Sequence, residues 1–307
     1  RKHYKFETRV AHAEWHEAEG LWQVETEAGE RYRAPYFISC AGMLSAPKVP
    51  PFPGHERYQG VIAHTARWPR EGIDLKGKRV GVVGTGATGI QVIQTIAGEV
   101  AELKVFQRTA QYAVRMNNER YDAAAFAKWR AQYPELRNKV HHTFAGFGFD
   151  FALPPWAELT PEQRRAELEK LWTDGSLAIW VGGFQETMMD PEINFEISEF
   201  IREKIRAQIK DPKKAELLVP REYGFGTYRV PLENGYYEAF NRDNVELIDV
   251  RKTPIERFTE KGLVVDGKEY ELDVVILATG FDAGTGALTR MDIHGRDGVS
   301  LTELWQK

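Results

Sequence analysis

Residues 78–91 read KRVGVVGTGATGIQ, and this stretch decides the fold of the 307-residue chain. A run of β-branched residues leads into a glycine-rich turn, and the turn opens a segment with the apolar spacing of an amphipathic helix. Residues 103–107 (LKVFQ) then predict a second strand. Strand, helix and strand in this order predict an α/β fold with a parallel sheet.

The glycines of this stretch form the pattern GxGxxG. In a dinucleotide-binding turn, the first glycine makes the turn, the second lets the backbone reach a pyrophosphate, and the third packs the helix on the strand. The start of the helix adds free amides and a positive dipole end. The alternative is a purely structural turn. The predicted cofactor contacts are Gly84, Thr85, Gly86, Ala87, Thr88, Gly89, Ile90 and Gln91.

The residue after the second strand indicates which dinucleotide would bind. An NAD-binding domain usually carries Asp or Glu about 20 residues after the turn, where the carboxylate holds a ribose hydroxyl. This chain has Arg108 there, followed by Thr109. Because a guanidinium suits a 2′-phosphate, we predict NADPH rather than NADH, with Arg108 and Thr109 among its contacts. The alternative is an arginine that faces solvent after a strand.

Two similar series of strands flank this unit, and a helical stretch interrupts it. The first series is predicted at 6–15, 21–26 and 31–40, and the second at 245–250, 255–258, 263–265 and 273–277. Each ends in small residues that let a backbone approach closely. Between about 117 and 221 the chain reads as helical, with a capping box at 160–163 and helical apolar spacing over 197–209.

Composition restricts the class of protein. The formal net charge of −4 argues against a nucleic-acid partner, which would normally require a basic surface. No apolar stretch reaches the ~20 residues of a membrane span. The single cysteine, Cys40, excludes an internal disulfide, favours a reducing, cytoplasmic setting, and is predicted to be buried on a strand. We assign no metal ligands, and the sequence does not indicate an oligomeric state.

Residues 58–69 (YQGVIAHTARWP) closely resemble the fingerprint of the Baeyer-Villiger monooxygenases, FxGxxxHxxxW followed by Pro or Asp. Only Tyr58, in place of Phe, departs from it. Related flavin monooxygenases that oxidise nitrogen and sulfur lack the ending formed by Trp68 and Pro69, so this ending favours the Baeyer-Villiger branch. From the sequence alone His64 would be a packed linker histidine, and within the family we also expect it to shape the link between domains.

The resemblance extends to residues 41–47, 105–109, 226–231 and 278–282. In the family NADPH reduces FAD, oxygen adds to the flavin, and the resulting peroxide attacks a ketone to give an ester or lactone. The resemblance implies that Arg229 stabilises the peroxide anion and the charge that develops during attack, which fits a permanent cation. Without the family, Arg229 would be read as a surface or ion-paired residue.

Two positions depart from the family pattern. Many members have lysine where this chain has Tyr228, at a position expected to assist the NADPH 2′-phosphate, so selectivity would depend more on Arg108. Tyr228 and Arg229 are both predicted to contact the cofactor. Many members have proline where this chain has Arg115, and nothing in the sequence explains that change.

The resemblance implies an α/β flavoprotein with two dinucleotide-binding domains, each Rossmann-like and three-layered with a β-meander. Residues 1–50 would be the end of the first FAD-domain segment, 51–282 the NADP domain with its helical insertion at about 117–221, and 283–307 the start of the second FAD segment. Because the first meander lacks its own glycine turn, we expect an FAD-binding turn before Arg1 and an FAD domain interrupted at Lys307. Val10 is predicted to contact the FAD adenine through its backbone.

The predicted function is therefore ketone oxygenation by a flavin monooxygenase with FAD, NADPH, O2 and a small-molecule ketone as partners, although the isolated piece is expected to be inactive. The alternatives are a flavin monooxygenase acting on nitrogen or sulfur compounds and a non-catalytic NADP-binding fragment. The aromatic tract at 144–151 fits either a hydrophobic core or a ketone pocket, and core packing is the commoner role.

Overall fold

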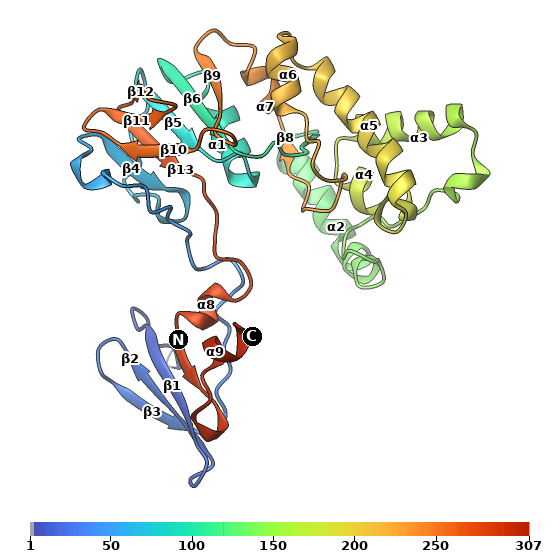
Figure 1. Cartoon of the computed structure of the whole chain (residues 1–307). Helices are drawn as coiled ribbons and strands as arrows, with labels where there is room; N and C mark the ends of the chain where they lie inside the picture. Colours follow the sequence, from blue (N-terminus) through green and yellow to red (C-terminus); the bar gives the residue numbers. More distant parts are fainter. Residues whose placement is uncertain (1–2, 119, 307) are drawn as a thin grey trace. The chain divides into compact units, whose positions relative to one another are not determined.

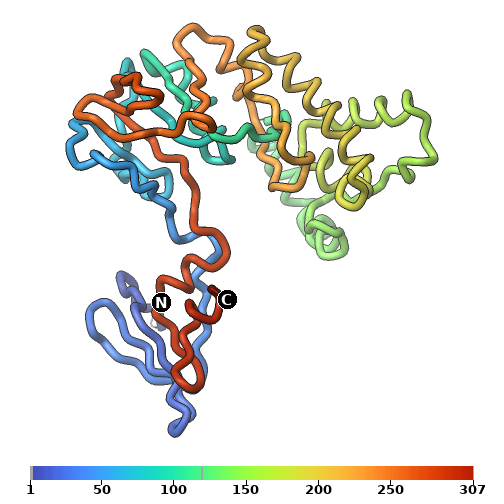
Figure 2. Tube along the Cα trace, in the orientation of Figure 1, coloured from blue at the N-terminus to red at the C-terminus, as the bar shows by residue number. Residues whose placement is uncertain are grey.

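The computed structural model describes residues 3–118 and 120–306, so Arg1 and Lys307, the ends of the chain, lie outside the described part. The chain divides into two compact units. Unit 1 comprises Arg1–Pro50 and Thr279–Lys307, and unit 2 comprises Pro51–Ala278 (Figures 1 and 2). Within the described residues, no helix combines the length and apolar character needed to cross a lipid bilayer.

A five-stranded sheet forms the centre of unit 2. Its order is β4-β13-β5-β6-β9, and every neighbouring pair is parallel. The strands are β4 (Val61–His64), β13 (Val274–Leu277), β5 (Arg79–Val83), β6 (Glu102–Gln107) and β9 (Val245–Asp249). The helix α1 (Ala87–Ile96) connects β5 to β6. The predicted parallel sheet is confirmed, and its order from β9 to β13 is that of the first four strands of a Rossmann sheet.

The sheet is the middle of three layers. On one face, Val80 and Val82 pack in a core cluster with Ile90 and Ile93 of α1. On the other, Val83 and Phe106 pack against a small antiparallel sheet. That sheet has the order β10-β11-β12, formed by Ile255–Phe258, Gly262–Val265 and Lys268–Glu271. Because both faces are covered, β5 and β13 read as continuous apolar runs rather than as alternating ones.

The segment between β6 and β9 is largely helical, as predicted. In Figure 1 its green and yellow helices gather to one side of the parallel sheet within unit 2. Its helices are α2 (Ala123–Val140), α3 (Pro161–Asp174), α4 (Ala178–Val181), α5 (Pro191–Ala207), α6 (Pro212–Leu218) and α7 (Tyr236–Ala239). The capping box of Thr160 and Gln163 is confirmed at the start of α3. Two short strands, β7 (Val114–Arg115) and β8 (Leu232–Glu233), pair in parallel.

Unit 1 contains a four-stranded sheet with the order β14-β1-β2-β3. Its strands are β14 (Asp292–His294), β1 (Val10–His16), β2 (Leu21–Thr26) and β3 (Arg31–Ala34), and its short helices are α8 (Gly286–Thr289) and α9 (Leu301–Trp305). The meander strands β1 to β3 are antiparallel, whereas β14 joins β1 in parallel from the far end of the chain.

Three sequence expectations were wrong. The third meander strand ends at Ala34 rather than at residue 40, because Pro35 lacks the N–H that would continue the ladder. Cys40 is therefore not buried on a strand but exposed. The aromatic tract is not core: Phe144 is 70% exposed, and Phe147 stacks on Phe149 at 5.2 Å near the surface.

Candidate functional site

The glycine turn follows β5 at the carboxyl edge of the parallel sheet. Gly84 has φ +104°, a conformation that side chains disfavour, and its N–H donates to the Phe106 carbonyl at 3.0 Å. A Cβ on Gly89 would lie 2.2 Å from the Gly84 carbonyl oxygen. Only glycine at position 89 therefore lets α1 pack directly on the turn without a shift.

Gly86 has a different role from Gly89, because the absence of a side chain at Gly86 leaves the start of α1 open. It is the N-cap of α1, and no side chain of the described residues caps the helix there. A Cβ on Gly86 would meet no described atom within 4 Å. The first amides of a helix have no partner inside it, so these N–H groups face an open approach. This geometry suits an anionic group such as a pyrophosphate.

The other predicted residues of the turn divide between the surface and the core. Ala87, Thr88 and Gln91 are exposed beside the helix start. Ile90 is fully buried in the core, and its N–H already donates to the Gly86 carbonyl at 2.9 Å. Ile90 thus packs the helix on the sheet and offers no free polar group to a ligand.

Arg108 lies next to the glycine turn because β5 and β6 are neighbouring parallel strands. The loops that follow these strands are joined by a hydrogen bond in which the hydroxyl of Thr85 donates to the Thr109 carbonyl at 3.0 Å. Thr85 is buried, whereas Arg108 is exposed. No acidic side chain in the described part of the chain pairs with Arg108, so its guanidinium is available for an anion.

A third loop, residues 222–231, is attached to the residues that follow Thr109. The hydroxyl of Tyr223 donates to the Ala110 carbonyl at 2.8 Å, and the hydroxyl of Tyr112 donates to the Tyr223 carbonyl at 3.3 Å. Tyr228 packs edge-on against Tyr223 with 4.8 Å between ring centroids. These contacts hold the Tyr228 loop on the segment that begins with Arg108.

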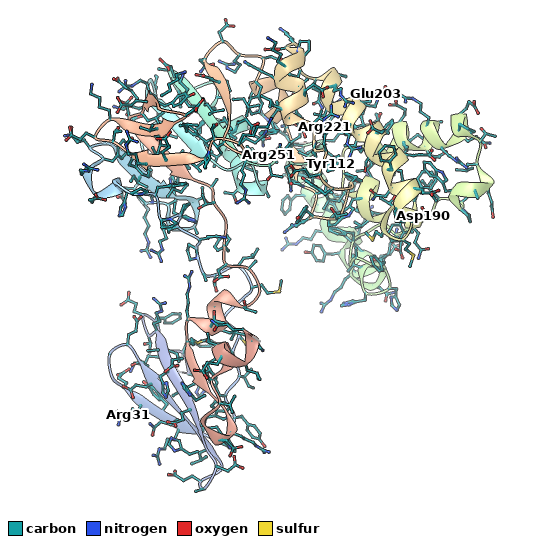
Figure 3. The ribbon with its side chains drawn as sticks, in the orientation of Figure 1. Arg31, Tyr112, Asp190, Glu203, Arg221 and Arg251 are labelled. Atoms are coloured by element: carbon teal, nitrogen blue, oxygen red, sulfur yellow. The ribbon has the colours of Figure 1, made fainter. Side chains whose placement is uncertain are left out.

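Arg251 ties the same loop to the edge of the sheet. It follows β9 and forms an ion pair with Glu222; Tyr112 and Arg251 are both labelled in Figure 3. Arg229 is exposed in this loop, directly before the buried Val230. The structure thus brings two sequence-distant parts of the predicted site, Arg108–Thr109 and Tyr228–Arg229, into one framework within unit 2.

Burial raises the pKa of two groups, Tyr223 and Glu233. It raises the pKa of Tyr223 well above its ordinary value, so the phenol remains a hydrogen-bond donor. Burial also raises the pKa of Glu233, although the N–H groups of Tyr236 and Gly235 oppose the rise. Arg115 pairs with Glu233 in the ladder of β7 and β8, and its charge also lowers that pKa. The structure therefore gives Arg115 a physical role, because its charge acts on the buried carboxyl group of Glu233.

The fingerprint residues 58–69 pack at the edge of the parallel sheet that β4 forms. The buried hydroxyl of Tyr58 donates to the Leu272 carbonyl at 2.9 Å, a bond that phenylalanine could not make. A Cβ on Gly60 would lie 2.4 Å from that hydroxyl and 2.6 Å from the Asp273 carbonyl oxygen. His64 is buried, and its Nδ1 accepts from the N–H of Ala66 at 3.1 Å in the turn after β4.

Val10 begins β1 in unit 1, next to an irregularity in the pairing with β2. Its predicted contact with FAD remains a prediction. Sequence reasoning missed Tyr223, whose hydroxyl joins the loops of unit 2. A signal was available, because Tyr223 and Tyr228 are aromatic residues in a glycine-containing loop, but nothing in the sequence relates that loop to residue 110.

Comparisons with known proteins agree with this geometry. The model of the flavin-binding monooxygenase-like family matches residues 1–144. An acetone monooxygenase (methyl acetate-forming) from Gordonia sp. (strain TY-5) is 51% identical over 308 residues, covering 100% of this chain and 58% of the relative. A Baeyer-Villiger monooxygenase from Pseudooceanicola batsensis is 42% identical, covering 100% of this chain and 56% of the relative. The chain thus spans a little over half the length of these relatives.

Among solved structures, the complex of OTEMO with FAD and NADP matches with a TM-score of 0.96 at 39% identity, covering 100% of this chain and 58% of that one. The predicted Rossmann-like α/β flavoprotein fold is confirmed by this likeness. These matches cover the whole chain. Over its whole length the chain is thus similar to Baeyer-Villiger monooxygenases, and its first 144 residues match the flavin-binding monooxygenase-like family.

Proposed function

We propose that this chain provides the NADPH-binding part of a monooxygenase that uses NADPH, FAD and O2 to insert one oxygen atom into a ketone, giving an ester or lactone. The observation that carries the proposal is the open, uncapped helix start at Gly86 beside the unpaired guanidinium of Arg108, among the described residues. The relative from Gordonia, which acts on acetone, supports a ketone as the substrate.

In this proposal the amides at Gly86–Thr88 bind the pyrophosphate of NADPH, and Arg108 binds its 2′-phosphate. Thr109, Tyr228 and Arg229 complete the contacts from the neighbouring loops. The proposed domains are 51–282 for NADP, with the helical insertion at about 117–221, and 1–50 with 283–307 for FAD, including Val10 at the adenine. The compact units divide the chain at Ala278–Thr279 instead of at residue 282.

When bound, FAD would supply the activation of oxygen, and NADPH would supply the electrons. The part played by this chain is binding, orientation and electrostatic stabilisation. Arg229 is an exposed cation in a loop fixed by Tyr223 and Arg251, so its backbone is held while its guanidinium remains free to move. A permanent cation of this kind stabilises negative charge that develops on a reacting oxygen.

The cofactor assignment is tested with Arg108→Ala. Loss of a guanidinium-phosphate contact should weaken NADPH binding about 10–100-fold, because a hydrogen bond to a charged group contributes about 1.5–3 kcal/mol. NADH lacks the 2′-phosphate, so its dissociation constant should change less than twofold. Arg137→Ala, an exposed arginine on α2, is the matched control and should change neither constant. Equal losses for NADPH and NADH would refute the role in 2′-phosphate binding.

The reaction class is tested with the natural protein that contains this sequence, supplied with FAD, NADPH and air. Acetone and cyclohexanone report ketone oxygenation, and a sulfide and an amine report the alternative activity on sulfur and nitrogen. We expect NADPH consumption coupled to ester or lactone, detected by gas chromatography with mass spectrometry. Sulfoxide or N-oxide without any ester would favour the alternative, and NADPH binding without oxidation would favour a non-catalytic NADP-binding protein.

We also propose a cytoplasmic setting. The single cysteine is exposed and unpaired, which suits a reducing compartment, and NADPH is supplied there. Expression of a fluorescent fusion of the natural protein, followed by cell fractionation, tests this location; recovery from the membrane or secreted fraction would contradict it.

A further inference from the structure

Unit 1 has a cluster of metal-ligating side chains on the surface formed by β1 and β14. Alternate residues of a strand share one face, so His12, Glu14 and His16 lie on the same side of β1. The parallel pairing places Asp292 opposite His12 and His294 opposite Glu14. Five side chains that can bind a metal therefore converge on one face of two neighbouring strands.

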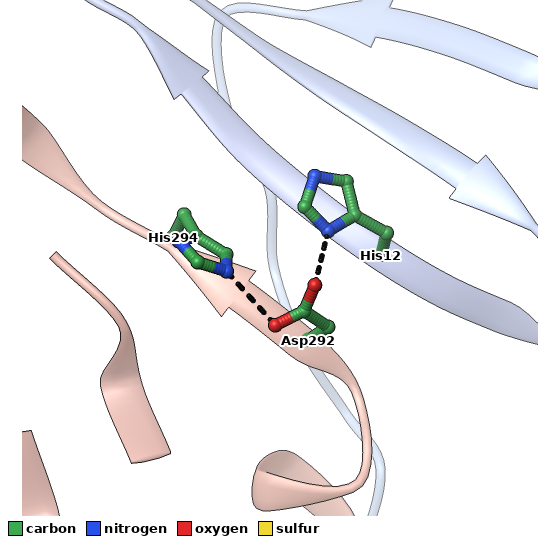
Figure 4. Close-up of side chains that lie close together, drawn as sticks. All are labelled: His12, Asp292 and His294. Carbon is green, nitrogen blue, oxygen red and sulfur yellow. Dashed lines mark hydrogen bonds and ion pairs between the residues drawn. The ribbon is translucent and has the colours of Figure 1, made fainter. Parts of the chain in front are cut away.

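Three of these side chains already meet. Figure 4 shows Asp292 between two imidazoles: its Oδ2 lies 2.9 Å from His12 Nδ1, and its Oδ1 lies 2.8 Å from His294 Nε2. One ligand atom from each of the three residues lies within 4.8 Å of the others. The histidine side chains retain 31% and 29% exposure, so an ion could reach them from solvent.

The ring of His294 is oriented by a second contact. Its Nδ1 lies 3.1 Å from the carbonyl oxygen of Gly298, an acceptor, so Nδ1 carries the hydrogen and donates. Histidines that bind metals usually donate the other ring N–H to a carbonyl or carboxylate in this way, which leaves the remaining nitrogen to bind the ion. In His294 the remaining nitrogen is Nε2, the atom that points at Asp292.

We propose that His12, Asp292 and His294 bind one divalent transition-metal ion, of which Zn²⁺ is the representative. Two imidazoles and a carboxylate are typical zinc ligands, and a water would take the fourth position. Glu14 Oε2 lies 3.8 Å from Nε2 of His12, the ring nitrogen that does not face Asp292, so Glu14 would act as an outer partner of that ring. Bonds of about 2.0–2.2 Å would place tetrahedral ligand atoms about 3.3–3.6 Å apart, and the three ligand atoms already lie within 4.8 Å of one another, so side-chain adjustments of about 1 Å would bring them to this spacing.

The position of this site gives the ion a structural role. β1 belongs to the first segment of unit 1 and β14 to the last, and the ladder between them is short, with three residue pairs. A metal bound by His12 from β1 and by Asp292 and His294 from β14 would hold the two segments of unit 1 together. The ion would therefore stabilise unit 1 without contributing to the chemistry proposed for unit 2, and this inference does not depend on that chemistry.

The test uses the chain without a histidine tag, stripped with a chelator and titrated with ZnCl₂ by calorimetry. We expect one ion per chain. His12→Ala and His294→Ala should each weaken Zn²⁺ binding at least about tenfold, since loss of even an outer partner costs about 10–100-fold. His55→Ala and Cys40→Ser are matched controls in other parts of the chain and should bind Zn²⁺ as the wild type does.

A second measurement separates binding from folding. Co²⁺ should give visible absorption bands with the wild-type chain that Asp292→Asn, which keeps the shape of the side chain, abolishes. Far-ultraviolet circular dichroism and NADPH affinity should be unchanged in all variants, because they report that the chain is folded. Unchanged Zn²⁺ affinity in both histidine variants would overturn the proposal and leave Asp292 as a hydrogen-bonding bridge between two histidines.

Discussion

Gly86→Ala separates ligand binding from folding at the glycine turn. Gly86 has φ −73° and ψ −175°, which is extended backbone that alanine adopts without strain. Its added Cβ would meet no described protein atom within 4 Å. A Gly-to-Ala exchange at a compatible position stabilises a protein by about 0.4–1 kcal/mol through the unfolded chain. We therefore expect an unfolding free energy equal to or slightly above that of the wild type.

In contrast to the unfolding free energy, the affinity for NADPH should fall in Gly86→Ala. The methyl group would occupy the space through which the pyrophosphate approaches the amides of α1. Loss of one hydrogen bond to a charged group costs about 1.5–3 kcal/mol, which corresponds to a dissociation constant raised about 10–100-fold. The predicted signature is thus a fully stable protein with poor cofactor affinity.

The assay is a fluorescence titration with NADPH, combined with urea unfolding of the same samples. Gly98→Ala is the matched control, because a Cβ there also meets nothing within 4 Å but lies in the turn beyond the other end of α1. It should change the unfolding free energy by about as much as Gly86→Ala does and should leave NADPH affinity unchanged. If Gly86→Ala binds NADPH as tightly as Gly98→Ala does, the pyrophosphate does not lie against this helix start.

Further substitutions test the supporting contacts. Thr85→Val should lower the unfolding free energy by about 1 kcal/mol and weaken NADPH binding, whereas Thr85→Ser, which keeps the donor to Thr109, should bind normally. Tyr58→Phe should cost about 1 kcal/mol in urea unfolding with no change in NADPH affinity, and a weaker affinity would contradict a packing role. Burial raises the pKa of Glu233 above its ordinary 4.5, so its contribution to stability is present below that pH and is lost as the pH rises through the folded-state pKa. Glu233→Gln should therefore gain stability relative to the wild type as the pH rises above about 4.5, and a constant difference would refute this.

The parallel sheet and the glycine turn were predictable because their signals are local. A β-branched run, a glycine pattern and helical spacing occur within residues 78–91, and each depends only on residues that are close in the sequence. The capping box of α3 was predictable for the same reason. β13 was read from an apolar run, because a strand covered on both faces needs apolar residues throughout.

The predictions that were wrong or missing concern residues whose structural partners lie far away in the sequence. Residues 35–40 look like a buried strand, yet no strand of the described chain pairs with them, and Tyr36 and Ile38 are each 81% exposed. β14 has three residues and becomes a strand only because β1 pairs with it. His12 lies 280 positions from Asp292, its partner in the cluster with His294, so no local sequence motif indicates this cluster.

The departure at Tyr228 has a physical consequence for cofactor selectivity. A lysine at this position would add a second cation, whereas Tyr228 contributes an exposed ring packed on Tyr223. In the proposed NADPH site, selectivity for the 2′-phosphate would then depend mainly on the guanidinium of Arg108, and the hydrogen bond between Thr85 and Thr109 joins the glycine turn to the loop that carries Arg108. A loop that carries a single cation must be held more firmly than one that shares the phosphate between two cations. We therefore expect the buried Thr85 hydroxyl to act on the proposed cofactor choice through the loop of Arg108 and not through a contact with the phosphate.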